Sequence, residues 1–295
     1  MPRAALLSIH ARVEGTEPST WEDPSLMQVW GPRYNAYVVA ASDLPVFTLA
    51  RLPDGGRIRE RAEDLAERLH ALLGAARMRY DDAGQALGVH PNALRYAALT
   101  GTLAIRWEGA RRPVVWTVPP PELEPAQATL ELARRFVRVF GPATPGGFAE
   151  WAGIGARKAA GAFDDLAGEL VPVRTPAGDA WLLGRDEARI REPETTAAAA
   201  RLLPSGDAYT LGITKEDRAL LVPDADRRRE LWTPRVWPGA LLVEGKVVGT
   251  WRRAEARVTI RTWQRLSSPA RAAVVAEVES LPLPGTAGRM TVDWG

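Results

Sequence analysis

The sequence predicts an α+β protein in which tandem winged-helix units are followed by a C-terminal β-barrel-like domain. Residues 80–118 and 143–183 repeat one order of short helix, turn, second helix and strand hairpin. After Ala200 the pattern changes to short alternating apolar runs separated by Gly and Pro, which indicates a separate β-rich region. The 295 residues therefore divide into a partial first winged-helix block (1–56), a second winged helix (57–121), a third winged helix (122–198) and the C-terminal domain (199–295).

The first block combines an apolar start with one strand and one short helix. Apolar residues gather at 4–9, and a turn-rich stretch follows. Residues 36–41 read as an apolar strand. Ser42 then opens a short helix before Leu44 and Pro45.

The second unit begins with apolar residues at helical spacing over 57–73. Asp81 or Asp82 can cap the next helix, and Gly88 supplies the left-handed residue that ends it. The fixed φ of Pro91 suits a first helical position, so a further helix is expected there.

That further helix runs to Ala97, with its apolar residues inward and Asn92, Arg95 or Tyr96 outward. Strands are then expected over 102–107 and 113–118, around a basic hairpin tip. This hairpin is the predicted wing.

The third unit starts with an amphipathic helix over 130–140. Thr144 caps the next helix, with Pro145 at its first position, and Gly153 or Gly155 turns the chain. Residues 156–166 form the candidate recognition helix, because the first turn of such a helix makes most base-edge contacts in a major groove.

The C-terminal region is expected to hold short strands, one helix over 269–281 and a last strand over 290–294. Glu244 and Gly245 form its tightest hairpin, next to Lys246. A solvated edge hairpin explains this lysine as well as a nucleic-acid contact does.

Cationic and polar residues at helix starts and hairpin tips make duplex DNA, possibly damaged, the leading partner. The alternative is a set of winged helices that only pack on one another. The predicted DNA-binding residues are Arg33, Asn92, Arg95, Tyr96, Arg111, Arg112, Arg157, Lys158 and Lys246.

The amino-acid composition excludes several classes of site and of protein. The net charge is +2 and only three of the 38 basic residues are lysines, an arginine bias that suits phosphate and guanine but that a GC-rich genome also produces. The absence of cysteine excludes disulfides and zinc fingers, and three scattered histidines disfavour a metal site. No apolar run is long enough for a membrane span or a signal peptide. We expect a cytoplasmic, nucleoid-associated monomer that needs no cofactor and no metal.

Three strings resemble a bacterial winged-helix DNA-binding family related to the alkylpurine and interstrand-crosslink DNA glycosylases. They are SLMQVWGPRYNAYVVAASDLPVFTLA, FGPATPGGFAEWAGI, and RLLPSGDAYTLG with LLVEGKVVGTW. The resemblance covers nearly the whole chain in the correct order. It implies three winged helices and a β-barrel that cradle duplex DNA.

Two departures from the family pattern concern catalysis. The glycosylases carry a Gln-x-Gln or Gln-x-Asp motif just before a segment that resembles LLSIHARVEG, where this sequence has only residues 1–5; Gln28 comes later and is not expected to replace it. The family's Pro-x-Phe-Asp-x-Tyr string reads Pro-Ser-Gly-Asp-Ala-Tyr here, which favours Asp207 as a turn-capping carboxylate. Asp43 and Asp207 remain the candidate catalytic residues.

Four functions stay open on these grounds. The first is damage recognition or repair on a glycosylase-like scaffold without the N-terminal motif. The second is an active alkylpurine or crosslink glycosylase, an N-glycosidic hydrolase with a rearranged site. The others are a winged-helix transcription regulator and a protein-interaction module.

Overall fold

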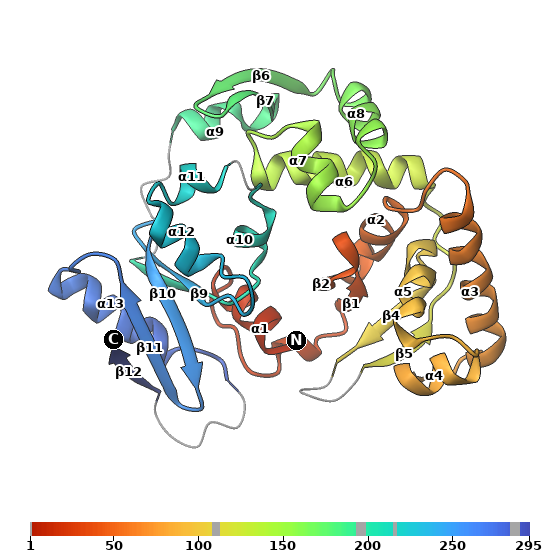
Figure 1. The fold of residues 1–295 in the computed structure, drawn as a ribbon, viewed down its shortest axis with the longest axis horizontal. Coiled ribbons are helices and arrows are strands. Elements are labelled where there is room, and N and C mark those ends of the chain that lie inside the picture. Colours follow the sequence, from red (N-terminus) through yellow and green to blue (C-terminus); the bar gives the residue numbers. More distant parts are fainter. Residues whose placement is uncertain (1, 108–112, 193–198, 215–216, 284–289) are drawn as a thin grey trace. The chain divides into compact units, whose positions relative to one another are not determined.

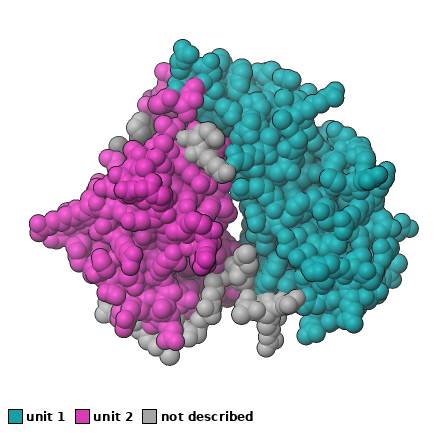
Figure 2. Space-filling view, viewed as in Figure 1, with its two compact units in different colours: residues 1–2, 22–175, 179–187 teal, residues 3–21, 176–178, 188–295 magenta. Residues whose placement is uncertain are grey.

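The computed structural model describes residues 2–107, 113–192, 199–214, 217–283 and 290–295. The chain forms two compact units (Figure 2), unit 1 with residues 1–2, 22–175 and 179–187, and unit 2 with residues 3–21, 176–178 and 188–295. The four domains expected from the sequence stay a prediction, since the contacts group the chain more coarsely.

Unit 1 is built on an antiparallel five-stranded sheet with the order β2-β1-β4-β5-β3. Its strands are β1 (Leu26–Trp30), β2 (Ala36–Ala40), β3 (Met78–Arg79), β4 (Leu103–Arg106) and β5 (Val114–Thr117). Gln28 of β1 lies opposite Ile105 of β4, so strands from residues 1–56 and from residues 57–121 share this sheet.

Helices of the first half of unit 1 follow the predicted order, and Figure 1 shows α3 and α5 side by side. They are α2 (Leu44–Leu49), α3 (Arg57–Leu73), α4 (Tyr80–Ala86) and α5 (Leu94–Ala97), with the 3₁₀ turns η2 (Pro32–Tyr34), η3 (Ala41–Asp43), η4 (Pro91–Ala93) and η5 (Ala98–Thr100). The turn η1 (Thr20–Glu22) lies where the chain passes from unit 2 to unit 1. The predicted helices over 57–73 and from Pro91 to Ala97 are confirmed, the latter as η4 running into α5.

One helix start in this half differs from the prediction. The helix α4 begins at Tyr80, so Asp81 and Asp82 lie in its first turn and neither caps it. The cause is the sheet, because the Tyr80 amide donates to the Pro113 carbonyl and fixes where the strand ends. The turn after α4 is as predicted, with Gly88 at φ +66°.

The second half of unit 1 contains three helices and a hairpin. They are α6 (Pro125–Phe140), α7 (Pro145–Ala152), α8 (Ala156–Asp165), β6 (Leu170–Thr175) and β7 (Gly178–Leu183), followed by η6 (Gly184–Asp186). The chain passes into unit 2 within α9 (Glu187–Arg191). Thr144 caps α7 as predicted, its Oγ1 accepting from the Gly147 amide at 3.0 Å. Gly153 makes the left-handed turn, at φ +70°.

Unit 2 pairs a second five-stranded sheet, of order β12-β11-β10-β9-β8, with a covering helix. Its elements are α1 (Pro2–His10), β8 (Ala200–Leu203), α10 (Ala208–Gly212), α11 (Arg218–Leu221), α12 (Ala225–Leu231), β9 (Gly239–Val243), β10 (Lys246–Ala254), β11 (Arg257–Thr262), α13 (Ser268–Glu279) and β12 (Thr291–Trp294). Val274 and Val278 of α13 and Leu7 of α1 share the core of this sheet.

The β-barrel-like domain expected from the sequence needs correction. Among the described strands the sheet is open, because no ladder joins β8 to β12. The helix α13 contacts both of these edge strands and so covers the face across which a barrel would close. The α+β class itself is confirmed, and no described helix has the length and apolar content to cross a membrane.

Candidate nucleic-acid interface

A strained turn of unit 1 presents two of its polar side chains. Arg33 and Tyr34 in η2 both adopt positive φ, +54° and +57°. Such a pair costs free energy and persists only where the surroundings fix it. The Tyr34 amide donates to the Gly31 carbonyl at 3.0 Å, and Gly153 at the end of α7 packs on the Arg33 backbone, where a Cβ would lie 3.3 Å from the Arg33 nitrogen.

A buried arginine supports this turn. Arg51 is 6% exposed and donates from Nε to the Ala152 carbonyl and from Nη1 to the Trp30 carbonyl, both at 3.2 Å. Its Cζ lies 4.5 Å from the centre of the Tyr34 ring. Burial lowers the pKa of Arg51 to about 10, so the side chain stays cationic at neutral pH.

Aromatic contacts continue from this turn to the helix-turn-helix. The Tyr34 and Tyr96 rings meet edge to face at 5.4 Å. Arg61, from α3, covers Tyr96 with its Cζ 4.4 Å from the ring centre. Two arginines and two tyrosines thus join η2, α3 and α5.

The start of the second helix is fixed by side-chain hydrogen bonds. His90 Nδ1 accepts from the Asn92 amide at 3.2 Å, a cap that supplements the conformational effect of Pro91. Asn92 Oδ1 accepts from the Tyr80 hydroxyl at 2.6 Å and from Arg95 Nη2 at 3.1 Å. These bonds orient Asn92 and Arg95.

These elements enclose a pocket of about 420 Å³. It is lined by Arg33, Tyr34, Arg61, His90, Asn92, Ala93, Arg95 and Tyr96. Four predicted DNA-binding residues therefore meet in one place. The sequence did not indicate Arg61, because its approach to Tyr96 depends on the packing of α3 against α5; Tyr34 and His90 adjoin predicted positions in sequence.

The other predicted DNA-binding residues lie elsewhere. Arg157 is exposed on the first turn of α8. Lys158 beside it turns inward, donating to the Leu52 carbonyl at 2.6 Å and pairing with Asp54 at 3.4 Å, and burial lowers its pKa. This engagement does not favour the DNA contact predicted for Lys158.

Lys246 is exposed at the start of β10 in unit 2. Arg111 and Arg112, the predicted wing tip, lie outside the described residues. Their DNA contacts stay a prediction.

Both candidate catalytic carboxylates are engaged by arginine. Asp43 pairs with Arg135 at 2.7 Å. Asp207 is 1% exposed and accepts from Arg12 at 2.7 and 2.9 Å and from the Ser8 hydroxyl at 2.6 Å.

Asp207 also caps α10, its Oδ1 accepting from the Tyr209 amide at 2.8 Å. The capping role expected from the sequence is confirmed. Each of the two carboxylates is thus paired with a guanidinium, and their catalytic roles stay a prediction.

Gln28 is buried in β1. Its side-chain oxygen accepts from the Trp107 amide at 2.8 Å, and the residue is 9% exposed. Strand alternation places it on the same face as Trp30, which packs on Tyr80 and Trp107. This contact extends the hydrogen bonding of β1 to β4 beyond the end of the ladder.

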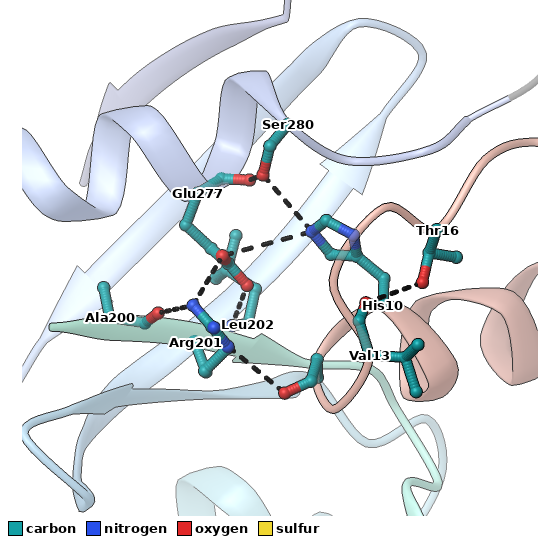
Figure 3. A network of polar contacts seen from close by, with 9 residues as sticks. His10, Val13, Thr16, Ala200, Arg201, Leu202, Glu277 and Ser280 are labelled. Carbon is teal, nitrogen blue, oxygen red and sulfur yellow. Dashed lines mark hydrogen bonds and ion pairs between the residues drawn. The ribbon is translucent and has the colours of Figure 1, made fainter. Parts of the chain in front are cut away.

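Unit 2 holds a separate polar network (Figure 3). Glu277 is 7% exposed; it accepts from the Leu202 amide at 3.1 Å and pairs with Arg201 at 3.3 Å. His10 lies 4.0 Å from this carboxylate and 3.2 Å from the Ser280 hydroxyl. The network ties α1, β8 and α13 together. In the described part of the chain no cluster of three metal-ligating side chains occurs.

Comparisons with known proteins identify the family and the fold. Residues 1–282 match the family described as DNA glycosylase AlkZ-like, and the chain belongs to this family. The DNA glycosylase AlkZ of Streptomyces sahachiroi superposes with a TM-score of 0.80 at 18% identity, over 99% of this chain and 89% of that chain. At this identity the likeness shows a shared fold. Curated proteins gave no significant match.

Proposed function

We propose that this protein binds duplex DNA, including damaged DNA, and acts in damage recognition or repair. The observation that carries the proposal is the pocket of unit 1, where Arg33, Asn92, Arg95 and Tyr96 meet Arg61 at the start of a helix-turn-helix. Membership of a DNA glycosylase family supports it.

The element order supports a winged-helix interpretation of both halves of unit 1. Helices α3, α4 and α5 with the hairpin β4–β5, and helices α6, α7 and α8 with β6–β7, each follow the winged-helix sequence of elements. In this interpretation α5 and α8 are the recognition helices. Arg95 of the pocket belongs to α5 and the exposed Arg157 to α8, and Asn92 lies in η4, which runs into α5.

Fluorescence anisotropy of a labelled duplex at two salt concentrations tests the proposal. We expect a Kd in the micromolar range at low salt and a clear loss of affinity at higher salt, because each phosphate neutralised by an arginine releases counterions. The net charge of +2 gives little attraction outside a local basic site. A flat salt response, or no binding at low salt, would overturn the proposal.

Base excision is the second candidate, and the family match favours it. We propose that this chain releases alkylated bases slowly or not at all. Attack at the sugar carbon needs a water held by a fixed acceptor, and Asp43 and Asp207 are both occupied by arginines.

Duplex DNA carrying N7-methylguanine, incubated with the protein and then cleaved by alkali at abasic sites, measures this activity. We expect few breaks above the protein-free rate. Prompt breaks that disappear in a folded Asp43→Asn variant would show that this carboxylate is catalytic.

A further inference from the structure

The described lining of the unit 1 pocket is rich in hydrogen-bond donors and holds no carboxylate. None of the described residues that line it is Asp or Glu. Arg61 makes no ion pair with any described carboxylate, and its guanidinium lies over the Tyr96 ring. Arg61 and Arg95 therefore line a space of about 420 Å³ without an ion-pair partner among the described residues.

One of these guanidinium groups has an unsatisfied donor. Arg95 Nε is buried and has no hydrogen-bond partner, although Nη2 of the same side chain donates to Asn92. A buried N–H without an acceptor costs free energy, so the local structure bears a cost to hold Arg95 in this position. Arg95 is held in place by the Asn92 bond, so its geometry is set before any ligand arrives.

The neighbouring polar groups also point to an acceptor ligand. Asn92 Oδ1 is used by Tyr80 and Arg95, which leaves the two amide protons of the side chain as donors. His90 Nδ1 accepts a backbone proton, which places the proton of the neutral ring on Nε2. The hydrogen-bonding capacity that Asn92 and His90 have left is therefore that of donors.

The two tyrosine rings are less suited to hold a base. Tyr34 already contacts Arg51 and Tyr96, and Tyr96 contacts Arg61. Ring faces covered by guanidinium groups favour a charged ligand that the cations can reach. A phosphate group has the charge and the acceptor oxygens that this donor set matches.

We propose that the pocket binds one phosphate group of DNA through Arg61 and Arg95. The inference rests on the proposed DNA binding and adds to it a fixed anchoring point. The phosphate is an internal phosphodiester or the terminal phosphate of a strand, two sources with the same chemistry.

Neutral backbone substitution tests the contact directly. A set of duplexes, each with one methylphosphonate at a successive position or with a 5′-hydroxyl in place of the 5′-phosphate, is titrated with the wild type, Arg61→Gln and Arg95→Gln. At one position, the neutral group is expected to weaken binding by the wild type about tenfold, as for loss of one charge-assisted hydrogen bond. The same position is expected to have little further effect in either variant.

The matched control is Arg59→Gln, on the same helix as Arg61. Arg59 pairs with Glu63 at 2.8 Å and does not line the pocket. It should keep the full sensitivity to the neutral position. Arg61 is exposed, so its variant should fold even if Arg95→Gln does not.

Each outcome decides between the two claims. Coupling at an internal position assigns a phosphodiester, and coupling at the 5′ end assigns a terminal phosphate. If the wild type binds but no neutral position weakens its binding more than that of the variants, the phosphate site is overturned and DNA binding remains. Absence of wild-type binding to every duplex overturns both.

Discussion

At the scale of single residues, Arg51 explains how a strained turn is kept in place. Its guanidinium bonds two carbonyl groups from different elements and stacks on Tyr34, whose φ is positive. Removing the Arg51 side chain leaves two buried carbonyl groups without donors, which destabilises the fold. It also removes the desolvation penalty of a buried charge, which offsets part of that loss. Arg51 does not line the pocket, so we expect it to affect DNA binding only by holding Tyr34 in place.

We expect Arg51→Met to lower the free energy of unfolding by about 1–3 kcal/mol and to weaken DNA binding. Arg77→Met is the control, because Arg77 also stacks on a ring, Trp116, at 4.5 Å but is exposed. The control should lose less than about 1 kcal/mol. Denaturant melts with anisotropy measure both effects, and equal losses in the two variants would contradict the supporting role of Arg51.

His10 gives unit 2 a predicted pH dependence. Burial lowers its pKa below 6.5, with Glu277 acting against the shift and Arg201 adding to it. The unfolded chain therefore binds the proton more tightly than the folded chain. Neutral His10 thus contributes to the free energy of unfolding above pH 6.5, and this contribution is lost as the pH falls through the folded pKa. His10→Gln should flatten the stability profile between about pH 7.5 and 5.5. Parallel profiles for wild type and variant would show that His10 titrates normally.

At the scale of elements, the helices that the sequence predicted are those whose ends are set by capping residues, prolines and glycines nearby in the chain. The cap at Thr144, the proline starts at Pro91 and Pro145 and the left-handed glycines at 88 and 153 act within a few residues of chain. The start of α4 depended on a sheet bond to Pro113, which lies far along the chain. Local pattern alone could not show it.

The same distinction applies to the pocket and the C-terminal sheet. Asn92, Arg95 and Tyr96 follow one another on a predicted helix, whereas Arg61 reaches them only through packing of α3 on α5. Alternating runs after Ala200 predicted strands, but whether a sheet closes depends on its edges, and α13 contacts both edge strands. Both the approach of Arg61 and the open sheet depend on tertiary packing, which a local sequence pattern does not show.

The junction of α7 with η2 is the element-scale test. Gly153→Ala places a Cβ 3.1 Å from Arg33 Cγ at a φ of +70°. We expect a loss of about 1–2 kcal/mol from the left-handed backbone and weaker DNA binding from a displaced Arg33. Gly155→Ala, at φ −67° with nothing within 4 Å of the new Cβ, should change stability by less than about 0.5 kcal/mol. Thermal melts and anisotropy compare the pair; unaltered binding by a destabilised Gly153 variant would show that this junction does not position the pocket.

At the scale of the whole molecule, each unit has its own apolar core around a five-stranded sheet. The net charge of +2 makes general attraction to DNA weak, so affinity has to come from a local arrangement. The donor-rich pocket of unit 1 is such an arrangement. We therefore expect DNA to contact the pocket of unit 1.

Hydrogen exchange of the whole protein, with and without a saturating duplex, tests that claim most directly. Bound DNA is expected to slow exchange in peptides covering 31–35 and 90–97, which carry the pocket's turn and helix start. Peptides from the buried strand β9 in unit 2 serve as an internal reference and should not change. Protection of both pocket peptides would support the account, whereas protection confined to other segments, with the pocket peptides exchanging as in free protein, would contradict it.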